Sequence, residues 1–224
     1  MAGMKPINQC RLYTFVDTTY LKNRPPEWVV EQLCLGGSDL IQLRAKPLAA
    51  DEVRRIAERI LPITEAASVG LVINDFPKVA QSVGAPVCHL GQDDFFDAGP
   101  THRAAWSDLR EPLKLGLSSH SPDQAMRAIA AGADYVAVGP VYQTGTKPTA
   151  KPVTLELVRW AANNLDLPWF AIGGITLENL DEVLDAGASR LCVVSAILNA
   201  PDLAVACREF KDRIESQIRG PQRT

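Results

Sequence analysis

The sequence lacks several features that mark whole classes of protein. It has no apolar run of 18 residues, the minimum for a membrane-spanning helix, so we expect no membrane partner. It has only three histidines and no Cys-x-x-Cys pair, which argues against a structural zinc site. Its 23 basic and 26 acidic residues give a net charge of −3, and a nucleic-acid partner normally requires a basic surplus. We therefore expect no nucleic-acid partner.

Cysteine pairing is also not indicated. The five cysteines are odd in number and widely spaced, and three of them lie inside apolar, strand-like runs. A reduced cysteine in such a run behaves as a small core residue, so we expect no disulfide framework and a cytoplasmic location. The first residues lack the apolar segment of a secretory signal. We expect residues 1–8 and 219–224 to be frayed tails.

Short apolar segments alternate with segments of helical periodicity along the whole chain. Parallel strands covered by helices are typically apolar almost throughout, and several of these segments are. Eight such units fit a single-domain (β/α)8 TIM barrel over residues 1–224, whereas an open doubly wound sheet does not require eight evenly spaced units. The predicted strands are 11–17, 40–45, 70–75, 87–91, 113–119, 134–141, 169–174 and 190–196.

A recurring glycine supports the count of eight. A helix-ending glycine precedes a strand at Gly37, Gly84, Gly132 and Gly187, at intervals of 47, 48 and 55 residues. Each interval is about two strand–helix units long, so these turns precede the even-numbered strands. The segment 95–110 is the least helical, and we expect the helix there to be short or irregular.

Polar side chains gather where the predicted strands end, which is the face that carries catalytic groups in TIM barrels. Gln42, Arg44 and Lys46 lie two residues apart, so strand alternation places them on one face. Two inward cations need anionic partners, and a diphosphate or triphosphate supplies them. The alternative is a pair of salt bridges at the barrel rim.

Two carboxylates follow neighbouring strands. Asp75 ends the third strand and Asp94 follows the fourth. Close carboxylates repel each other unless a proton or a cation lies between them, and Mg²⁺ needs only one or two carboxylates together with phosphate oxygens. We therefore predict a Mg²⁺ site at Asp75 and Asp94. The alternative is that either residue is only a helix N-cap.

The last two strands end in a pattern that suits a phosphate. Gly173 and Gly174 follow the seventh strand and Ser195 follows the eighth, where TIM barrels often bind phosphate groups. Glycine lets backbone N–H groups approach an anion, and a following helix N-terminus favours negative charge.

The loop 142–153 is polar and longer than most connections of its kind. Its Thr144, Thr146 and Lys147 suit phosphate binding, so we interpret it as a lid, with an ordinary exposed loop as the alternative. We interpret His89 and His102 as structural.

These motifs, in this order, resemble the thiamine phosphate synthase family, also called thiamine-phosphate pyrophosphorylases. The resemblance extends from the second strand to the eighth. The segments that carry it are IQLRAK (41–46), VIND (72–75), HLGQDD (89–94), LGLSSH (115–120), DYVAVGPVYQTGTK (134–147), AIGGI (171–175) and VVSAI (193–197).

The resemblance implies a TIM-barrel transferase of thiamine biosynthesis. Such an enzyme joins a pyrimidinylmethyl pyrophosphate to a thiazole phosphate and releases pyrophosphate, with Mg²⁺ as cofactor. The catalytic residues would be Arg44, Lys46, Ser118 and Lys147, and Asp75 with Asp94 would bind the metal. The substrates would be bound by Gln42, Arg44, Lys46, Asn74, Ser118, Thr144, Thr146, Lys147, Gly174, Val194 and Ser195.

Three positions depart from the family pattern: Ala45, Phe76 and Gln143 replace an acidic residue, an arginine and a proline. Ala45 and Phe76 should point away from the catalytic face, so we expect modest effects. A related thiazole tautomerase shares the barrel and a histidine at the position of His120, and a non-catalytic phosphate-binding barrel is a further alternative. A homo-oligomer is possible.

Overall fold

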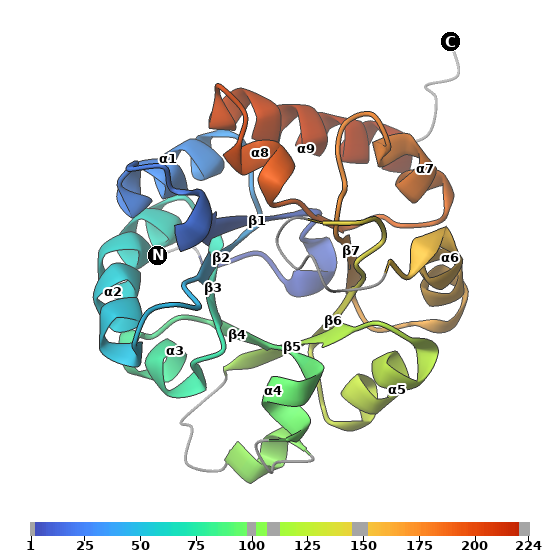
Figure 1. Cartoon of the computed structure of the whole chain (residues 1–224), viewed down its shortest axis with the longest axis horizontal. Helices are drawn as coiled ribbons and strands as arrows, with labels where there is room; N and C mark the ends of the chain where they lie inside the picture. Colours follow the sequence, from blue (N-terminus) through green and yellow to red (C-terminus); the bar gives the residue numbers. More distant parts are fainter. Residues whose placement is uncertain (1–2, 98–101, 107–112, 145–151, 220–224) are drawn as a thin grey trace.

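The structure, a computed structural model, describes residues 3–97, 102–106, 113–144 and 152–219. Eight parallel strands form a closed barrel in chain order, and β1 completes the ring by pairing with both β2 and β8. Figure 1 shows the strands at the centre and the helices in a ring around them. The predicted (β/α)8 barrel is confirmed.

The elements have the following bounds. The strands are β1 (Leu12–Asp17), β2 (Leu40–Arg44), β3 (Gly70–Asn74), β4 (Val87–Leu90), β5 (Lys114–Ser119), β6 (Tyr135–Val138), β7 (Trp169–Ile172) and β8 (Leu191–Cys192). The α-helices are α1 (Pro26–Leu35), α2 (Ala50–Ala66), α3 (Pro77–Val83), α4 (Gln92–Phe96), α5 (Pro122–Ala130), α6 (Thr154–Asn164), α7 (Leu180–Asp185), α8 (Ser195–Leu198) and α9 (Leu203–Arg219). The described residues also contain the short 3₁₀ turns η1 (Ile7–Gln9), η2 (Thr18–Tyr20) and η3 (Arg103–Trp106).

All eight predicted strands are present, and the largest differences are at the ends of two of them. The sixth ends at Val138 and the eighth at Cys192, each earlier than predicted. In both cases residues beyond the strand, such as Gly139 and Val194, line the central cavity. The helix after β4 is short, as predicted, since α4 covers only Gln92–Phe96.

The four helix-ending glycines adopt the left-handed conformation that the repeat predicts. Their φ angles are 88° at Gly37, 81° at Gly84, 84° at Gly132 and 102° at Gly187. A β-carbon is strained in this conformation, so glycine is favoured where the chain turns from a helix into the next strand. These turns precede β2, β4, β6 and β8, in agreement with the prediction.

Aromatic rings fill the middle of the barrel. Tyr13 stacks on Phe15 with ring centroids 5.3 Å apart, and it meets Tyr135 and Phe170 edge to face at 6.0 and 5.4 Å. Tyr13, Tyr135 and Phe170 have no exposed surface. These rings close the barrel below the cavity, so the polar residues at the strand ends stand on a rigid base.

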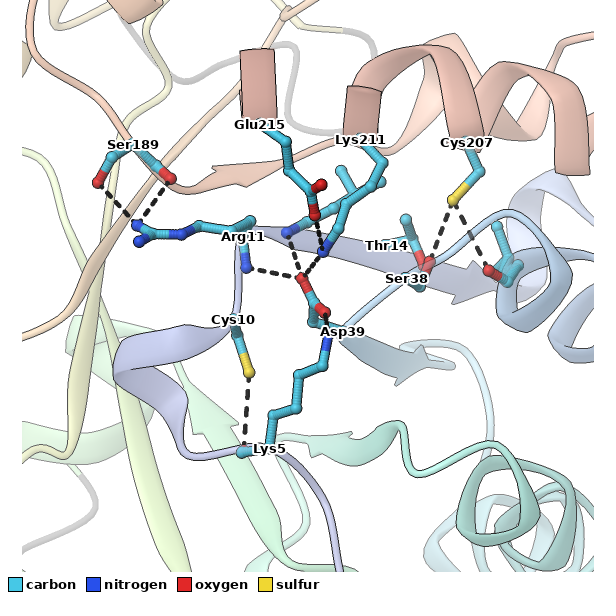
Figure 2. Close-up of polar contacts among 12 residues, drawn as sticks. Lys5, Cys10, Arg11, Thr14, Ser38, Asp39, Ser189, Cys207, Lys211 and Glu215 are labelled. Atoms are coloured by element: carbon cyan, nitrogen blue, oxygen red, sulfur yellow. Dashed lines mark hydrogen bonds and ion pairs between the residues drawn. The ribbon is translucent and has the colours of Figure 1, made fainter. Parts of the chain in front are cut away.

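A buried carboxylate ties together the opposite, amino-terminal end of the barrel. Asp39, directly before β2, accepts hydrogen bonds from Lys5 Nζ (2.7 Å), Lys211 Nζ and the backbone N–H groups of Arg11 (2.7 Å) and Leu12 (3.1 Å). Figure 2 shows Lys5 and Lys211 approaching Asp39 from opposite sides. Burial alone would raise the pKa of Asp39, but the hydrogen bonds from Lys211, Lys5 and the two amides outweigh it and lower the pKa.

This cluster corrects the prediction of a frayed tail for residues 3–8, whereas residues 1 and 2 of that predicted tail lie outside the described part. Lys5 pairs with Asp39, and Ile7 is buried. The local sequence pattern does not predict this ion pair, because Asp39, the partner of Lys5, lies 34 residues away. At the other end, α9 extends to Arg219, the first residue of the second predicted tail, and residues 220–224 lie outside the described part.

The cysteines lie mostly in the interior of the protein. All five cysteines lie in the described part of the chain and none is paired. Burial raises the pKa of Cys10 to about 12 and those of Cys34 and Cys207 to about 11, so these thiols stay protonated. Within the described residues, every helix is too short or too polar to cross a bilayer.

Candidate active site

A central cavity opens among the carboxyl ends of the strands. Most of the substrate-binding residues expected from the family resemblance line it, and their positions agree with the expectation, whereas their roles remain predictions. Thr146 and Lys147 lie outside the described residues. The predicted residues that line the cavity are Gln42, Arg44, Asn74, Ser118, Thr144, Gly174, Val194 and Ser195.

Arg44 projects from β2 into the cavity and is held by a fixed counter-charge. Its Nη1 atom donates to Asp17 Oδ2 at 2.7 Å, and the Asp17 side chain is fully buried. Asp17 Oδ1 in turn accepts from the backbone N–H (3.0 Å) and hydroxyl (2.7 Å) of Thr19. Because a guanidinium has five N–H donors, the pair orients Arg44 and leaves it able to bind a second anion.

Lys46 lies at the rim of the barrel between the two predicted metal ligands. Its Nζ atom is 3.1 Å from Asp75 Oδ2 and 3.9 Å from Asp94 Oδ2. Both carboxylates therefore lie beside one ammonium group, and the Mg²⁺ site predicted at Asp75 and Asp94 remains a prediction. The alternative prediction of rim salt bridges also holds for Arg44 and Lys46. Asp94 lies in the first turn of α4, not at a strand end.

The backbone at Asp75 is unusual. Its φ angle of 66° is left-handed, a conformation that aspartate tolerates better than most residues. Its backbone N–H donates to the carbonyl of His89 on β4 at 3.0 Å. The bend directs the chain from β3 into α3, which begins two residues later, and places the Asp75 carboxylate beside Lys46.

Two glycines bring the end of β7 close to the loop after β6. Gly173 and Gly174 have φ angles of 104° and 66°. A β-carbon on Gly174 would lie 2.6 Å from the Gln143 carbonyl oxygen and 2.7 Å from Tyr142 Cβ, so only glycine fits there. Ser195 lines the cavity beside them at the start of α8, although this helix has only four residues.

The predicted lid 142–153 is described only at its two ends. The Tyr142 N–H donates to the Gly173 carbonyl at 3.0 Å, and the Val153 N–H donates to the Pro140 carbonyl at 2.8 Å. Both ends are thus fixed at the mouth of the cavity, where Thr144 lines the wall. Residues 145–151 lie outside the described part, so the lid remains a prediction.

His89, which the sequence led us to interpret as structural, is buried in β4 and also faces the cavity. Its Nε2 atom lies 3.0 Å from the hydroxyl of Ser118. The sequence held a signal for this position. His89 lies two residues after Val87 and therefore on the same face of β4. Strand alternation thus allows its side chain to point into the barrel.

The sequence pattern alone gave no role to two further residues that lie at the site, Asp17 and His120. Asp17 is the last residue of the first predicted strand, the one strand end from which no candidate was taken. His120 also lines the cavity, and its Nδ1 atom bonds the carbonyl of Gly139. A carbonyl only accepts, so His120 Nδ1 carries a proton.

The cavity offers charge and hydrogen bonding and no activated thiol. Burial raises the pKa of Cys192, which lines the floor, well above its ordinary value. That thiol therefore stays neutral. Arginine, hydroxyl and amide donors instead line the cavity, with Lys46 beside Asp75 at its rim, an arrangement suited to phosphorylated ligands.

Fold and site together define a (β/α)8 barrel of the enzyme type, with a polar cavity at the carboxyl ends of its strands, where such barrels carry their active sites. The chain belongs to the thiamine monophosphate synthase family, whose model matches residues 12–197.

Individual relatives give the same picture. The chain is 43% identical over 185 residues to a thiamine-phosphate synthase of Thermus thermophilus, covering 82% of this chain and 86% of that one. It is 36% identical to the thiamine-phosphate synthase of Halalkalibacterium halodurans, covering 92% and 96%. A solved thiamine phosphate pyrophosphorylase from Pyrococcus furiosus superposes with a TM-score of 0.84 at 28% identity, covering 96% and 100%.

Proposed function

We propose that the chain is a thiamine-phosphate synthase, a transferase that joins a pyrimidinylmethyl pyrophosphate to a thiazole phosphate and releases pyrophosphate. The observation that carries the proposal is the match of the family model over residues 12–197, together with 43% identity to a relative of that name. The cavity lined by Arg44, Ser118 and Gly174 supplies the donors that two phosphorylated substrates require.

The proposed reaction needs no protein nucleophile. Pyrophosphate departs first, and the resonance-stabilised pyrimidinylmethyl cation that remains is captured by the thiazole nitrogen. The protein then has to stabilise the negative charge that grows on the leaving group. Arg44, fixed by Asp17 at 2.7 Å, is oriented before the substrate arrives, so little reorganisation is needed. Lys46 adds a second cation at the rim, and Lys147 is proposed as a third.

Asp75 and Asp94 fit a Mg²⁺ ion. They converge on the ammonium group of Lys46 at 3.1 and 3.9 Å, so the two carboxylates already face a shared cation. Among the described residues no three His, Cys, Asp or Glu side chains gather as a metal site, but Mg²⁺ bound through substrate phosphates needs only one or two carboxylates. Such an ion would neutralise charge on the departing pyrophosphate.

The two substrates would occupy different parts of the cavity. Gln42 and Asn74 come from neighbouring strands β2 and β3, on the side of the proposed metal ligands, and we assign the pyrimidine pyrophosphate to them. Gly174, Val194 and Ser195 line the wall formed by β7 and β8, and we assign the thiazole phosphate to that wall. Thr144 stands at the mouth beside it, and Thr146 is proposed to join it.

Incubation of the purified protein with both substrates and Mg²⁺, followed by chromatographic identification of the product, tests the proposal. Thiamine phosphate is the expected product. A rearranged thiazole without coupling would instead assign the thiazole tautomerase reaction, and a bound but unchanged substrate pair would assign the non-catalytic barrel. The cytoplasmic location and a homo-oligomeric state remain predictions.

A further inference from the structure

A continuous line of hydrogen bonds crosses the barrel at the floor of the cavity. The Gln42 amide nitrogen lies 2.5 Å from the Tyr13 hydroxyl, and the Tyr13 and Tyr135 hydroxyls are 3.0 Å apart. The Tyr135 hydroxyl lies 3.1 Å from His89 Nδ1, and His89 Nε2 lies 3.0 Å from the Ser118 hydroxyl. Gln42 and Ser118, the two ends of this line, both line the cavity.

The line is shielded from water along most of its length. Tyr13 and Tyr135 have no exposed surface, Gln42 is 2% exposed and His89 is 6% exposed. Burial raises the pKa of both tyrosines well above the ordinary value, so both hydroxyls keep their protons. Gly116 makes the arrangement possible, because a β-carbon at that position would overlap the Tyr135 ring.

The donors in this line have one consistent direction. An amide nitrogen only donates, so the Tyr13 oxygen accepts from Gln42 and its own proton goes to the Tyr135 oxygen. The Tyr135 proton then goes to His89 Nδ1, which must be unprotonated. A neutral imidazole with a bare Nδ1 carries its proton on Nε2, and that proton points to the Ser118 oxygen.

The opposite direction leaves a buried proton without a partner. If Ser118 donated to His89, the Tyr135 hydroxyl would donate to the Tyr13 oxygen, which already accepts from Gln42. With the Gln42 amide nitrogen facing Tyr13, the Tyr13 proton would then have no acceptor among the described residues around it, and Tyr13 has no exposed surface. An unsatisfied buried donor costs about 1–3 kcal/mol, so the first direction is favoured.

We propose that His89 is a positioning residue whose Nε2–H, fixed by Tyr135 and Gln42 across the barrel, holds the Ser118 hydroxyl as a donor toward an anionic substrate oxygen. Ser118 already accepts from His89, so its single proton is left for the cavity. Within the described residues, no other acceptor is bonded to that hydroxyl. The donation to substrate rests on the proposed function, whereas the protonation state of His89 does not.

The tautomer of His89 can be measured in the free protein by nitrogen-15 NMR of the imidazole side chains. The chain has only three histidines, and the signals that disappear in His89→Asn identify His89. We expect a pyrrole-type Nε2 and a pyridine-type Nδ1 at neutral pH. A proton on Nδ1, or a rapid mixture of both tautomers, would overturn the proposed positioning role of His89, whatever the activity of the protein.

Two replacements separate positioning from packing. Gln at position 89 can place an amide N–H where Nε2 lies, whereas Asn is too short to reach Ser118. We expect His89→Asn to lower kcat by about 10- to 100-fold, the loss typical of a hydrogen bond that serves a charged group, and His89→Gln to recover much of it. Equal losses in the two variants would show that the donor at Nε2 has no role.

A double-mutant cycle then links His89 to Ser118. If His89 acts through the serine hydroxyl, adding His89→Asn to Ser118→Ala lowers kcat no further. If His89→Asn lowers kcat by the same factor in Ser118→Ala as in the unmodified protein, His89 acts by another route and the proposal is overturned. Circular dichroism and unfolding midpoints of all variants verify that each protein is folded. If a variant does not fold, the NMR measurement of the His89 tautomer in the unmodified protein still tests the proposal.

Discussion

Asp17 and Arg44 lie opposite each other in the register of β1 and β2, and their side chains form an ion pair of 2.7 Å at the edge of the cavity. The aspartate is fully buried and makes two more hydrogen bonds to Thr19. The orientation of the arginine is therefore decided by the fold before any anion binds, which is the condition for efficient electrostatic catalysis.

Asp17→Asn should impair catalysis by releasing Arg44 from this orientation. The amide keeps the shape of the carboxylate but loses its charge, so we expect kcat/KM for the pyrimidine pyrophosphate to fall by about 10-fold or more. Glu58→Gln is the matched control, because it weakens the exposed Arg54–Glu58 pair far from the cavity. Steady-state kinetics of both variants decide the matter, and equal kcat/KM values in the two would contradict the role given to Asp17.

Asp75→Asn and Asp94→Asn should each raise the Mg²⁺ concentration needed for half-maximal activity and lower the maximal rate. Each removes one anionic oxygen from the pair around Lys46, at a cost of about several kcal/mol in transition-state stabilisation. Asp93→Asn is the control, since Asp93 is exposed on the same turn as Asp94. Metal titrations that superimpose for all three variants and the unmodified protein would exclude the site.

Asp39→Asn should destabilise the fold in a pH-dependent way. The pKa of Asp39 is lowered in the folded protein, so its stabilising contribution is complete above the unfolded pKa of about 3.9 and is lost as the pH falls through the lower folded value. Removing one partner of a buried ion pair costs about 3–5 kcal/mol, so we expect a loss of that order in the free energy of unfolding at pH 7.

The measurement for Asp39 is urea unfolding at several pH values. The difference between the unmodified protein and Asp39→Asn should shrink once the pH falls below about 4. Asp181→Asn, which breaks the exposed pair with Arg213, should cost less than about 1 kcal/mol throughout. A pH-independent difference for Asp39→Asn would mean that its charge is not what stabilises the amino-terminal end of the barrel.

His120→Ala should retain most of the coupling activity, whereas Ser118→Ala should lose much more. A synthase that works by ionisation of the pyrophosphate needs no proton shuttle, and His120 Nδ1 is already engaged by the Gly139 carbonyl. Initial rates of the two variants, measured side by side, test this. A His120→Ala defect as large as that of Ser118→Ala would place histidine acid–base chemistry at the centre of the reaction and favour the tautomerase.

Much of this architecture is readable from the sequence because local rules determine it. Apolar runs locate all eight strands, and left-handed glycines at the ends of helices mark every second one. Strand alternation then turns Gln42 and Arg44 inward without any knowledge of tertiary contacts. The inward orientation of Gln42 and Arg44 follows from strand periodicity and barrel topology, and both can be inferred from a single sequence.

What the sequence did not predict depends on contacts between distant segments. Lys5 is ordered by Asp39, and Arg44 is oriented by Asp17, 27 residues earlier. The role proposed for His89 depends on Tyr135, 46 residues later, and on Ser118. None of these pairs produces a local pattern, and an inward histidine in an apolar strand is equally compatible with a core residue. Only the closed barrel brings the partners within hydrogen-bonding distance.

The most direct test of the account is the initial rate of pyrophosphate release by the purified protein, measured with each component of the reaction omitted in turn. The account predicts rapid release only when the pyrimidine pyrophosphate, the thiazole phosphate and Mg²⁺ are all present, with thiamine phosphate formed in equal amount. Folded protein that releases no pyrophosphate with all three components present would contradict it.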